Sequence, residues 1–242
     1  MKKYFFFRMA DKLYNYAFPL YYPMYVFYKN IHDFNEMEII RHHVKSGFTV
    51  IDIGANIGVI TRLLAGLVGQ TGHVHAFEPD LRNFAHLSRL TGLPNVKTNN
   101  AAIGDKDGTI DLYVSEDMNV DHRTYPVDEK RERTSVECFA VDSYIKDKPV
   151  DFIKMDIQGY EYKALCGMRK TVSAGSCKAI LMELWPYGLE KAGSTVSQVM
   201  DLLVECGFYP QLLYRGELVA FSENLIENKE TKVYTLLAEK TV

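Results

Sequence analysis

An apolar run that ends in an acid and passes straight into a glycine turn is the feature that most constrains this chain. The run, Val50 to Ile53, is rich in β-branched residues and predicts a buried parallel strand, and residues 54–58 predict a tight turn into a helix. Because open α/β sheets bind ligands at the carboxyl ends of their strands, we expect a cofactor at this turn. Its predicted contacts are Asp52, which would face the crevice, and the turn residues Gly54, Ala55, Asn56 and Gly58.

A second acid indicates that this cofactor contains adenosine. Residues 73–79 predict the next strand, and Glu78 near its end follows Gly58 by about 20 residues. At that distance an acid accepts hydrogen bonds from both hydroxyls of a ribose. A glycine turn alone is also compatible with an ordinary strand-to-helix connection, so the prediction depends on the pair.

The adenine would lie next to small residues. Asp80 is placed to cap a helix, and residues 96–100 predict a third strand. The residues after these two strands leave room for a flat ring, so the predicted contacts are Pro79, Asn100 and Ala101.

The residues between the glycines select among adenosine cofactors. A dinucleotide fingerprint needs GxGxxG, but here Asn56 and Val59 stand where further glycines would be required. The turn instead resembles the acid-x-Gly-x-Gly-x-Gly loop of S-adenosylmethionine (SAM) methyltransferases, with Asn56 at the middle glycine. Asn tolerates left-handed backbone better than most residues, so this replacement is physically reasonable.

Helices and strands alternate along the rest of the chain, which predicts an α/β fold with a doubly wound, mostly parallel sheet. Further strands are expected near residues 109–114, 135–140, 150–156, 179–185, 208–214, 218–221 and 233–238. We divide the chain into an aromatic-rich helical cap, residues 1–34, and a cofactor-binding domain, residues 35–242.

Two later strands also end in acids. Asp156 occupies the position on its strand that Asp52 occupies on the first, and Glu183 interrupts the apolar run of the next strand. We expect both beside the reacting group, with Lys154 on the same face of the sheet as Asp156. Alternatively, Asp156 caps the following helix and Glu183 pairs with Lys154.

A metal ion is a further alternative for these two acids. Two carboxylates at adjacent strand ends could hold one Mg²⁺, which would lower the pKa of a bound hydroxyl. The sequence offers only two good oxygen ligands there, so deprotonation by a carboxylate or by His122 is favoured over metal catalysis.

The polar segment 115–134 is long for a connection in a compact domain, which is typical of functional or disordered loops. It contains His122 and Arg123, a base and an anion-binding guanidinium that the loop could bring over a substrate. Its charged run, residues 128–133, is expected to be solvated.

The first 30 residues are rich in tyrosine and phenylalanine. The apolar run at residues 4–7 is too short for a signal peptide, and Pro19 and Pro23 argue against a spanning helix. The remaining possibilities are a helical cap on the core, a homodimer contact, or a peripheral membrane surface. Aromatic rings also stack on sugars, so a cap of this kind could help to hold a glycan.

The net charge and the cysteines indicate which partners and which cellular compartment to expect. The net charge of −3 gives no global basic field, so nucleic acid is not an expected partner. The four cysteines lack metal-type spacing and are expected to be buried free thiols. This predicts a reducing compartment, the cytoplasm, with the inner face of the membrane as a further location.

Four segments occur in an order and spacing that resemble the FkbM family of SAM-dependent methyltransferases: VIDIGANIG (50–58), HAFEPD (75–80), NAAIGDKDG (100–108) and DFIKMDIQGYE (151–161). With MELWP (182–186), the resemblance covers residues 35–240. The family pattern usually has Val-Glu-Gly-Ala-Glu where this chain has Ile-Gln-Gly-Tyr-Glu at residues 157–161.

The resemblance implies a Rossmann-like sheet of seven strands with the last one antiparallel, and SAM as cofactor. It also implies O-methyl transfer to a hydroxyl, most often on a sugar of a glycan, glycolipid or glycosylated natural product. The available bases are then Asp156, Glu183 and His122, and the expected substrate contacts are Arg123, Lys154, Tyr160 and Glu161.

Two other functions stay open at this point. A protein with the same fold could act without catalysis at a membrane surface or as a scaffold. An NAD-dependent oxidoreductase is less favoured, because it would need the missing GxGxxG.

Overall fold

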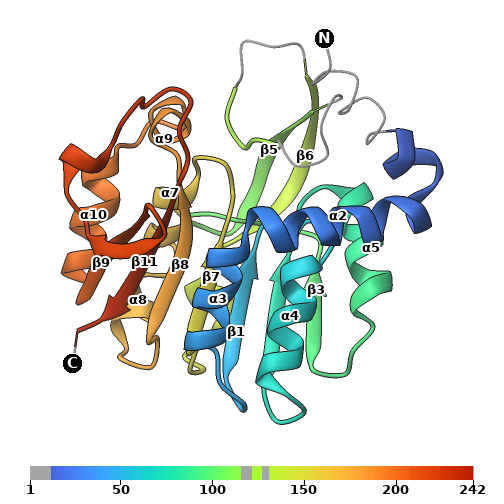
Figure 1. The fold of residues 1–242 in the computed structure, drawn as a ribbon, viewed down its shortest axis with the longest axis horizontal. Helices are drawn as coiled ribbons and strands as arrows, with labels where there is room; N and C mark the ends of the chain where they lie inside the picture. Colours follow the sequence, from blue (N-terminus) through green and yellow to red (C-terminus); the bar gives the residue numbers. More distant parts are fainter. Residues whose placement is uncertain (1–11, 116–121, 127–130, 242) are drawn as a thin grey trace.

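The structure of this chain is a computed structural model, and it describes residues 12–115, 122–126 and 131–241. Within these residues the strands form two sheets (Figure 1). The large sheet has the order β10-β9-β11-β8-β7-β1-β2-β3 and contains β1 (Thr49–Ile53), β2 (His73–Phe77), β3 (Val96–Asn99), β7 (Phe152–Met155), β8 (Ala179–Leu184), β9 (Phe208–Tyr214), β10 (Glu217–Ala220) and β11 (Tyr234–Lys240).

The doubly wound, mostly parallel sheet predicted from the sequence is confirmed. The central strands β3, β2, β1, β7 and β8 are parallel neighbours, and β11 is antiparallel to both β8 and β9. The sheet has one strand more than the seven expected, because β10 folds back on β9 at the edge. The connecting residues Arg215 (φ 54°) and Gly216 (φ 89°) have the left-handed backbone that a two-residue hairpin requires.

A second, smaller sheet stands apart from the large one. It consists of β4 (Ala102–Ile103), β5 (Gly108–Val114) and β6 (Glu132–Phe139), in the order β4-β6-β5. Strands near residues 109–114 and 135–140 were expected from their alternation. Their separation from the main sheet is not visible in that pattern, which specifies a strand but not its partner.

Helices cover both faces of the large sheet, and the alternation of side chains along the strands assigns each residue to a face. Val50 of β1 packs with α3 and α4, whereas Ile51 and Ile53 pack with the helices on the opposite side. The helices are α2 (Phe18–His32), α3 (Phe34–His43), α4 (Val59–Val68), α5 (Leu81–Thr91), α6 (Val141–Ile145), α7 (Glu161–Cys166), α8 (Arg169–Ser173), α9 (Pro186–Lys191) and α10 (Val196–Glu205).

Helix α2 lies across the edge of the sheet at which the central strands end (Figure 1). Tyr21 of α2 and Tyr14, in the helical turn of residues 12–16, are buried against Ile57 in the β1–α4 connection. In the part of the chain that the structure describes, no helix is long and apolar enough to cross a membrane.

Candidate active site

A cavity of about 690 Å³ lies where β1, β2, β7 and β8 end, with α2 forming part of its wall. Most of the predicted site residues line it: Gly54, Ala55, Asn56, Glu78, Pro79, Ala101, His122, Arg123, Lys154, Asp156, Tyr160 and Glu183. Four of them do not line it: Asp52, Gly58, Asn100 and Glu161.

The turn after β1 has the backbone that its glycines and Asn56 predict. Gly54 (φ 77°), Asn56 (φ 51°) and Gly58 (φ 88°) are all left-handed. The Asn56 side chain supports this conformation, because its Oδ1 accepts a hydrogen bond from the Ile57 N–H at 2.7 Å. A Cβ at Gly54 would lie 1.9 Å from the carbonyl oxygen of Asp156, so glycine is required there for contact between strand ends as well.

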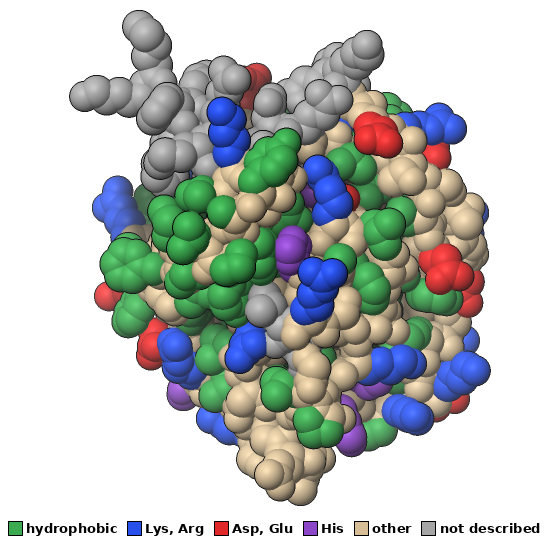
Figure 2. Space-filling model, turned by 90° about the vertical axis from the view of Figure 1, so that its right-hand side faces the viewer, with side chains coloured by type: hydrophobic (Ala, Val, Ile, Leu, Met, Phe, Trp, Pro, Cys, Tyr) green, Lys and Arg blue, Asp and Glu red, His purple; other side chains and the backbone are tan. Residues whose placement is uncertain are grey.

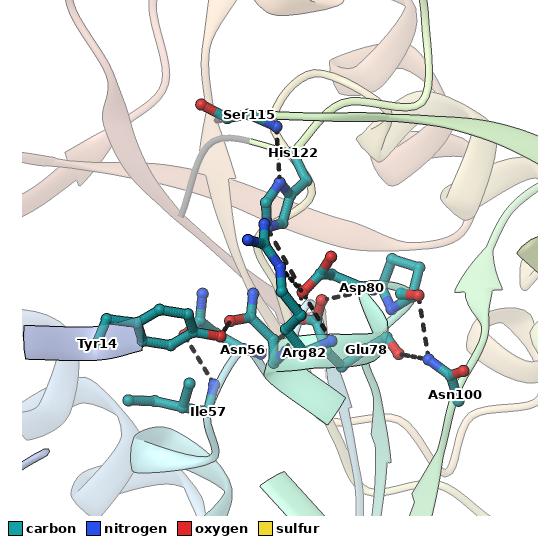
Figure 3. A network of polar contacts seen from close by, with 11 residues as sticks. Tyr14, Asn56, Ile57, Glu78, Asp80, Arg82, Asn100, Ser115 and His122 are labelled. Atoms are coloured by element: carbon teal, nitrogen blue, oxygen red, sulfur yellow. Dashed lines mark hydrogen bonds and ion pairs between the residues drawn. The ribbon is translucent and has the colours of Figure 1, made fainter. Parts of the chain in front are cut away.

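Glu78 presents a buried carboxylate to the cavity from the end of β2 (Figure 3). Its Oε2 accepts from the Asn56 N–H at 2.8 Å and its Oε1 from the Asp80 N–H at 3.0 Å. Burial raises the pKa of this carboxyl to about 8, although the two N–H groups favour its charged form. Glu78 therefore ties the two loops of the predicted cofactor site together.

The loop after β2 is held by two side chains that sequence analysis had singled out. Asp80 caps α5, as predicted, and accepts from the N–H groups of Arg82 and Asn83. Asn100 donates to the carbonyl oxygens of Glu78 (2.9 Å) and Pro79 (3.1 Å). Because Asn100 is committed to the backbone in this way, it positions the predicted adenine site rather than lining it.

The ring of His122 lies over Asp80 (Figure 3). Its Nδ1 accepts from the Ser115 N–H at 3.1 Å, and its Nε2 lies 3.9 Å from Asp80 Oδ1. These contacts place His122 at the cofactor end of the cavity. His122 is therefore a less suitable general base than the two carboxylates, Asp156 and Glu183.

Asp156 and Glu183 are brought together by Gln158, a residue that sequence analysis missed. Its side-chain Nε2 donates to Asp156 Oδ1 at 2.9 Å and to Glu183 Oε2 at 2.7 Å. Gln158 itself has left-handed backbone (φ 56°), and its carbonyl accepts from the hydroxyl of Tyr125 at 2.9 Å. The departure from the family pattern at this position was the only available signal.

The two carboxyls hold their protons with different strength. Burial acts to raise the pKa of Asp156, but the ammonium groups of Lys154 and Lys29 outweigh it and hold that pKa below its ordinary value. Burial raises the pKa of Glu183 well above its ordinary value, and the charges of Asp156 and Glu161 raise it further. Asp156 therefore gives up its proton more readily than Glu183 does.

Lys154 lies between two acids of neighbouring strands. Its Nζ is 3.6 Å from Asp156 Oδ2 and 4.0 Å from Asp52 Oδ1. Burial lowers the pKa of Lys154, but Asp156, Asp52 and Glu36 together more than compensate, so its pKa is raised. The buried ammonium is thus charged and keeps Asp156 ionised.

Asp52 does not face the crevice, contrary to the prediction. It lies on the same face of β1 as Val50, which α4 covers, and its Oδ2 accepts from the Thr61 hydroxyl of α4 at 2.6 Å. Its side chain is fully buried, and this burial raises its pKa. Asp52 therefore acts on the site through Lys154.

Glu161 is also placed differently from the prediction. Its Oε1 accepts from the N–H groups of Ile157 and Gly159, both at 3.2 Å, and the side chain is fully buried below the loop. Burial raises its pKa to about 7. Glu161 shapes the loop that carries Gln158 and does not reach a substrate in the cavity.

Aromatic and basic side chains are also part of the wall. The guanidinium of Arg123 lies 4.9 Å above the ring of Trp185, which follows β8, and Tyr160 stands on the wall with a pKa raised by burial to about 12. Helix α2 adds Tyr25 and Lys29. Neither Trp185 nor the α2 residues were predicted site residues.

The donor set between β7 and β8 does not suit a metal ion. The amide nitrogen of Gln158 occupies the position between the two carboxylates and binds both. Among the described residues, no group of three His, Cys, Asp or Glu side chains could hold a metal.

Comparisons with known proteins identify the family and the fold of this chain. A family model described as "Methyltransferase FkbM domain" matches residues 52–210. Three solved structures are similar: a candidate rRNA methylase from Clostridium thermocellum (17% identity, 86% of this chain and 94% of that chain, TM-score 0.54), a candidate methyltransferase from Streptococcus mutans in complex with SAH (11%, 85% and 96%, 0.51), and a methyltransferase FkbM from Methylobacillus flagellatus (18%, 84% and 50%, 0.49).

At these identities the first two of these structures show a shared fold alone. The comparison with curated proteins gave no match.

Proposed function

This chain belongs to the FkbM methyltransferase domain family, and we propose on that premise that it is a SAM-dependent O-methyltransferase. The acceptor is a hydroxyl on a sugar of a glycan, glycolipid or glycosylated natural product. The observation that carries this proposal is that one cavity joins Glu78 to Asp156 and Glu183.

The Glu78 end of the cavity fits the nucleoside part of SAM. Each oxygen of its carboxyl accepts one backbone hydrogen bond and Asn83 interacts with the same side chain, which still leaves an acceptor position for a ribose hydroxyl. The nearby wall residues Pro79 and Ala101 are compact, as a flat adenine requires. A cavity of about 690 Å³ has room for a nucleoside and part of an acceptor.

The opposite end of the cavity can hold the reacting hydroxyl. SAM, when bound, supplies an electrophilic sulfonium methyl group. Asp156 is ionised, lines the cavity and can take the proton of the acceptor hydroxyl, while Lys154 holds it in its charged form. Gln158 fixes the carboxylate in one orientation.

The aromatic residues of the cavity support a sugar acceptor. Tyr25 and Tyr28 of α2 and Trp185 after β8 line the cavity, and aromatic side chains are typical contacts of the apolar face of a sugar. The net charge of −3 argues against nucleic acid as acceptor, although one of the similar structures is a candidate rRNA methylase. Because its four cysteines are free thiols, we place the protein in the cytoplasm.

The first test is cofactor binding measured by calorimetry. Replacing Glu78 with Ala should weaken SAM affinity by about ten- to a hundredfold, because the ribose hydroxyls lose their buried hydrogen-bond partner. Glu205→Ala, at an exposed acid of α10, is the matched control and should bind SAM as the parent does. Parental affinity of Glu78→Ala, or preference for NAD over SAM, would refute the proposed cofactor site.

The second test is methyl transfer from labelled SAM to cell-envelope glycans. Asp156→Asn should lower turnover by about 10²–10⁴, the usual cost of losing a general base, while SAM affinity and melting temperature stay close to parental. An Asp156→Asn, Glu183→Gln double variant with near-parental transfer would rule out this chemistry. If EDTA leaves the rate of methyl transfer unchanged, the carboxylates act as a base and not as metal ligands.

A further inference from the structure

Four large apolar side chains form a stripe on the outer face of α2. Leu20, Met24, Phe27 and Ile31 are 64%, 50%, 68% and 64% exposed, and they recur every three or four residues, which places them on one side of the helix. The stripe runs for about 17 Å at 1.5 Å per residue. A contiguous apolar surface of this kind marks an interaction site more often than scattered exposed residues do.

The surface around this stripe is basic, whereas the whole protein has a net negative charge. Helices α2, α4 and α5 form this side of the molecule, and their sequences contain no Asp or Glu. Exposed Arg62, Arg82 and Arg89 lie on α4 and α5, although the whole chain has a net charge of −3. Figure 2 shows the apolar patch with basic side chains beside it.

Two of these arginines are close to the aromatic residues of the cap. Arg62 is near enough to Tyr22 of α2 to lower the pKa of its hydroxyl against the effect of burial, and Arg82 acts in the same direction on Tyr14. Figure 2 shows cations and exposed apolar side chains on the same side of the molecule. Such a face is complementary to a lipid bilayer, which has an apolar interior and, where its lipids are acidic, an anionic surface.

A second copy of this chain fits the face less well than a lipid surface does. In a two-fold dimer the same patch meets itself, so arginines would face arginines across the interface. Helices α2, α4 and α5 contain no acids, and Asp80 at the start of α5 lies 3.9 Å from Arg82 of its own chain. The tyrosines bordering the stripe, Tyr16 (89% exposed) and Tyr28 (50%), are typical of the membrane interface.

The geometry points to a membrane-docking face: the outer side of α2 inserts Leu20, Phe27 and Ile31 into an anionic lipid surface. Arg62 and Arg82 then lie at the level of the headgroup phosphates. The helix lies in the plane of the interface, as an amphipathic helix with an adjacent basic surface does.

This orientation presents the cavity to the membrane. Met24 and Tyr28 are half exposed on α2 and also line the cavity, so its opening lies beside the docking face. An acceptor sugar carried on a lipid could therefore enter the cavity from the bilayer. This last step rests on the proposed methyl transfer, whereas docking itself does not.

The test is flotation of the full chain with vesicles, without SAM. We expect binding to phosphatidylcholine vesicles that contain phosphatidylglycerol, and weaker binding to pure phosphatidylcholine or at raised salt. Phe27→Gln with Ile31→Gln should reduce binding by about tenfold or more, because two apolar side chains no longer leave water. Val204→Gln with Tyr209→Gln, at exposed apolar positions on α10 and β9, is the matched control and should bind as the parent does.

SAM affinity and the melting temperature of each variant, measured alongside, show that α2 is intact. Failure to bind anionic vesicles, or equal binding by the α2 variant and the control, would overturn the docking face. The docking face would also be overturned if the parent protein is a dimer and the α2 variant is a monomer, because a second copy of the chain would then cover the stripe. If the parent protein does not bind SAM, the proposed function is refuted, but the vesicle result still tests the docking face.

Discussion

At the scale of single residues, the amide of Gln158 decides how the two acids of the site coexist. Asp156 and Glu183 come from neighbouring strands and each accept one hydrogen bond from the same nitrogen. An acid at position 158, as in the usual family pattern, would add a third carboxyl and remove this donor. The neutral amide instead adds no charge between two carboxyls whose pKa values are shifted in opposite directions.

We predict that Gln158→Leu raises the pKa of Asp156, because a hydrogen bond to its charged form is lost. Gln158→Glu should raise the pKa of Glu183 further through like-charge repulsion. Carbon-13 NMR titration of the side-chain carboxyls measures both changes. Gln211→Leu removes an amide that binds Glu239 on another part of the sheet and should leave both titrations unchanged. Identical titrations in the Gln158 variants and the parent would contradict this role.

The residues that sequence analysis misplaced were assigned without their neighbours. Asp52 stands on the face of β1 that Val50 shares, so strand periodicity already indicates that a helix covers it. The position of Thr61, which binds it, depends on the packing of α4. For Gln158 the only signal was its departure from the family pattern, and its function arises only when β7 and β8 bring two acids together.

At the scale of elements, the N-terminal cap is connected to the cofactor site by hydrogen bonds. The Tyr14 hydroxyl donates to Asn83 Oδ1 at 2.7 Å, and the side chain of Asn83 in turn stabilises the charged form of Glu78. The ring of Tyr14 packs edge-on against Tyr21 of α2. The cap is therefore joined to the predicted ribose site through Asn83.

Replacing Tyr14 with Phe should keep this packing but leave the buried Asn83 oxygen without the hydroxyl. We expect the free energy of unfolding to fall by about 1–3 kcal/mol. Urea denaturation measures the change, and Tyr16→Phe, at a tyrosine 89% exposed, is the matched control with no expected effect. Equal stability of the two variants would contradict a structural connection through Asn83.

The elements of the large sheet could be predicted because apolar periodicity and glycine turns are local signals. The location of α2 could not. Its tyrosines and phenylalanines occur on all sides, so Tyr21 faces the core and Phe27 faces solvent without any difference in residue type to separate them. The separate small sheet was missed for a related reason, since the partners of a strand lie far away in the sequence.

At the scale of the whole molecule, the cavity concentrates buried acids at one edge of the sheet. The pKa of Glu78 is raised to about 8 and that of Glu161 to about 7 by burial, and that of Glu183 is also raised. Asp156 is the exception, with a lowered pKa. The stability of the protein without ligand should therefore depend on pH through these groups.

The sign of this dependence follows from proton binding. A carboxyl whose pKa is higher in the folded state than in the unfolded state, near 4.3, binds more protons when folded. The stability that such a group contributes is complete below the unfolded pKa. It is lost as pH rises through the folded pKa, which is about 7 for Glu161 and about 8 for Glu78. Asp156 acts oppositely, but only at acidic pH, where its stabilisation is lost as pH falls through its lowered pKa.

We therefore predict that the free energy of unfolding decreases from pH 5 to pH 8.5 when SAM is absent. Each such group contributes a slope of at most about 1.4 kcal/mol per pH unit, and urea denaturation across this range measures the sum. Glu161→Gln should flatten the curve, because the amide oxygen can still accept the N–H groups of Ile157 and Gly159 while no buried charge forms at high pH. Glu205→Gln, at an exposed acid, should leave the slope parental. A stability that rises over this range, or a slope unchanged by Glu161→Gln, would show that the buried carboxyls do not retain their protons in the folded protein.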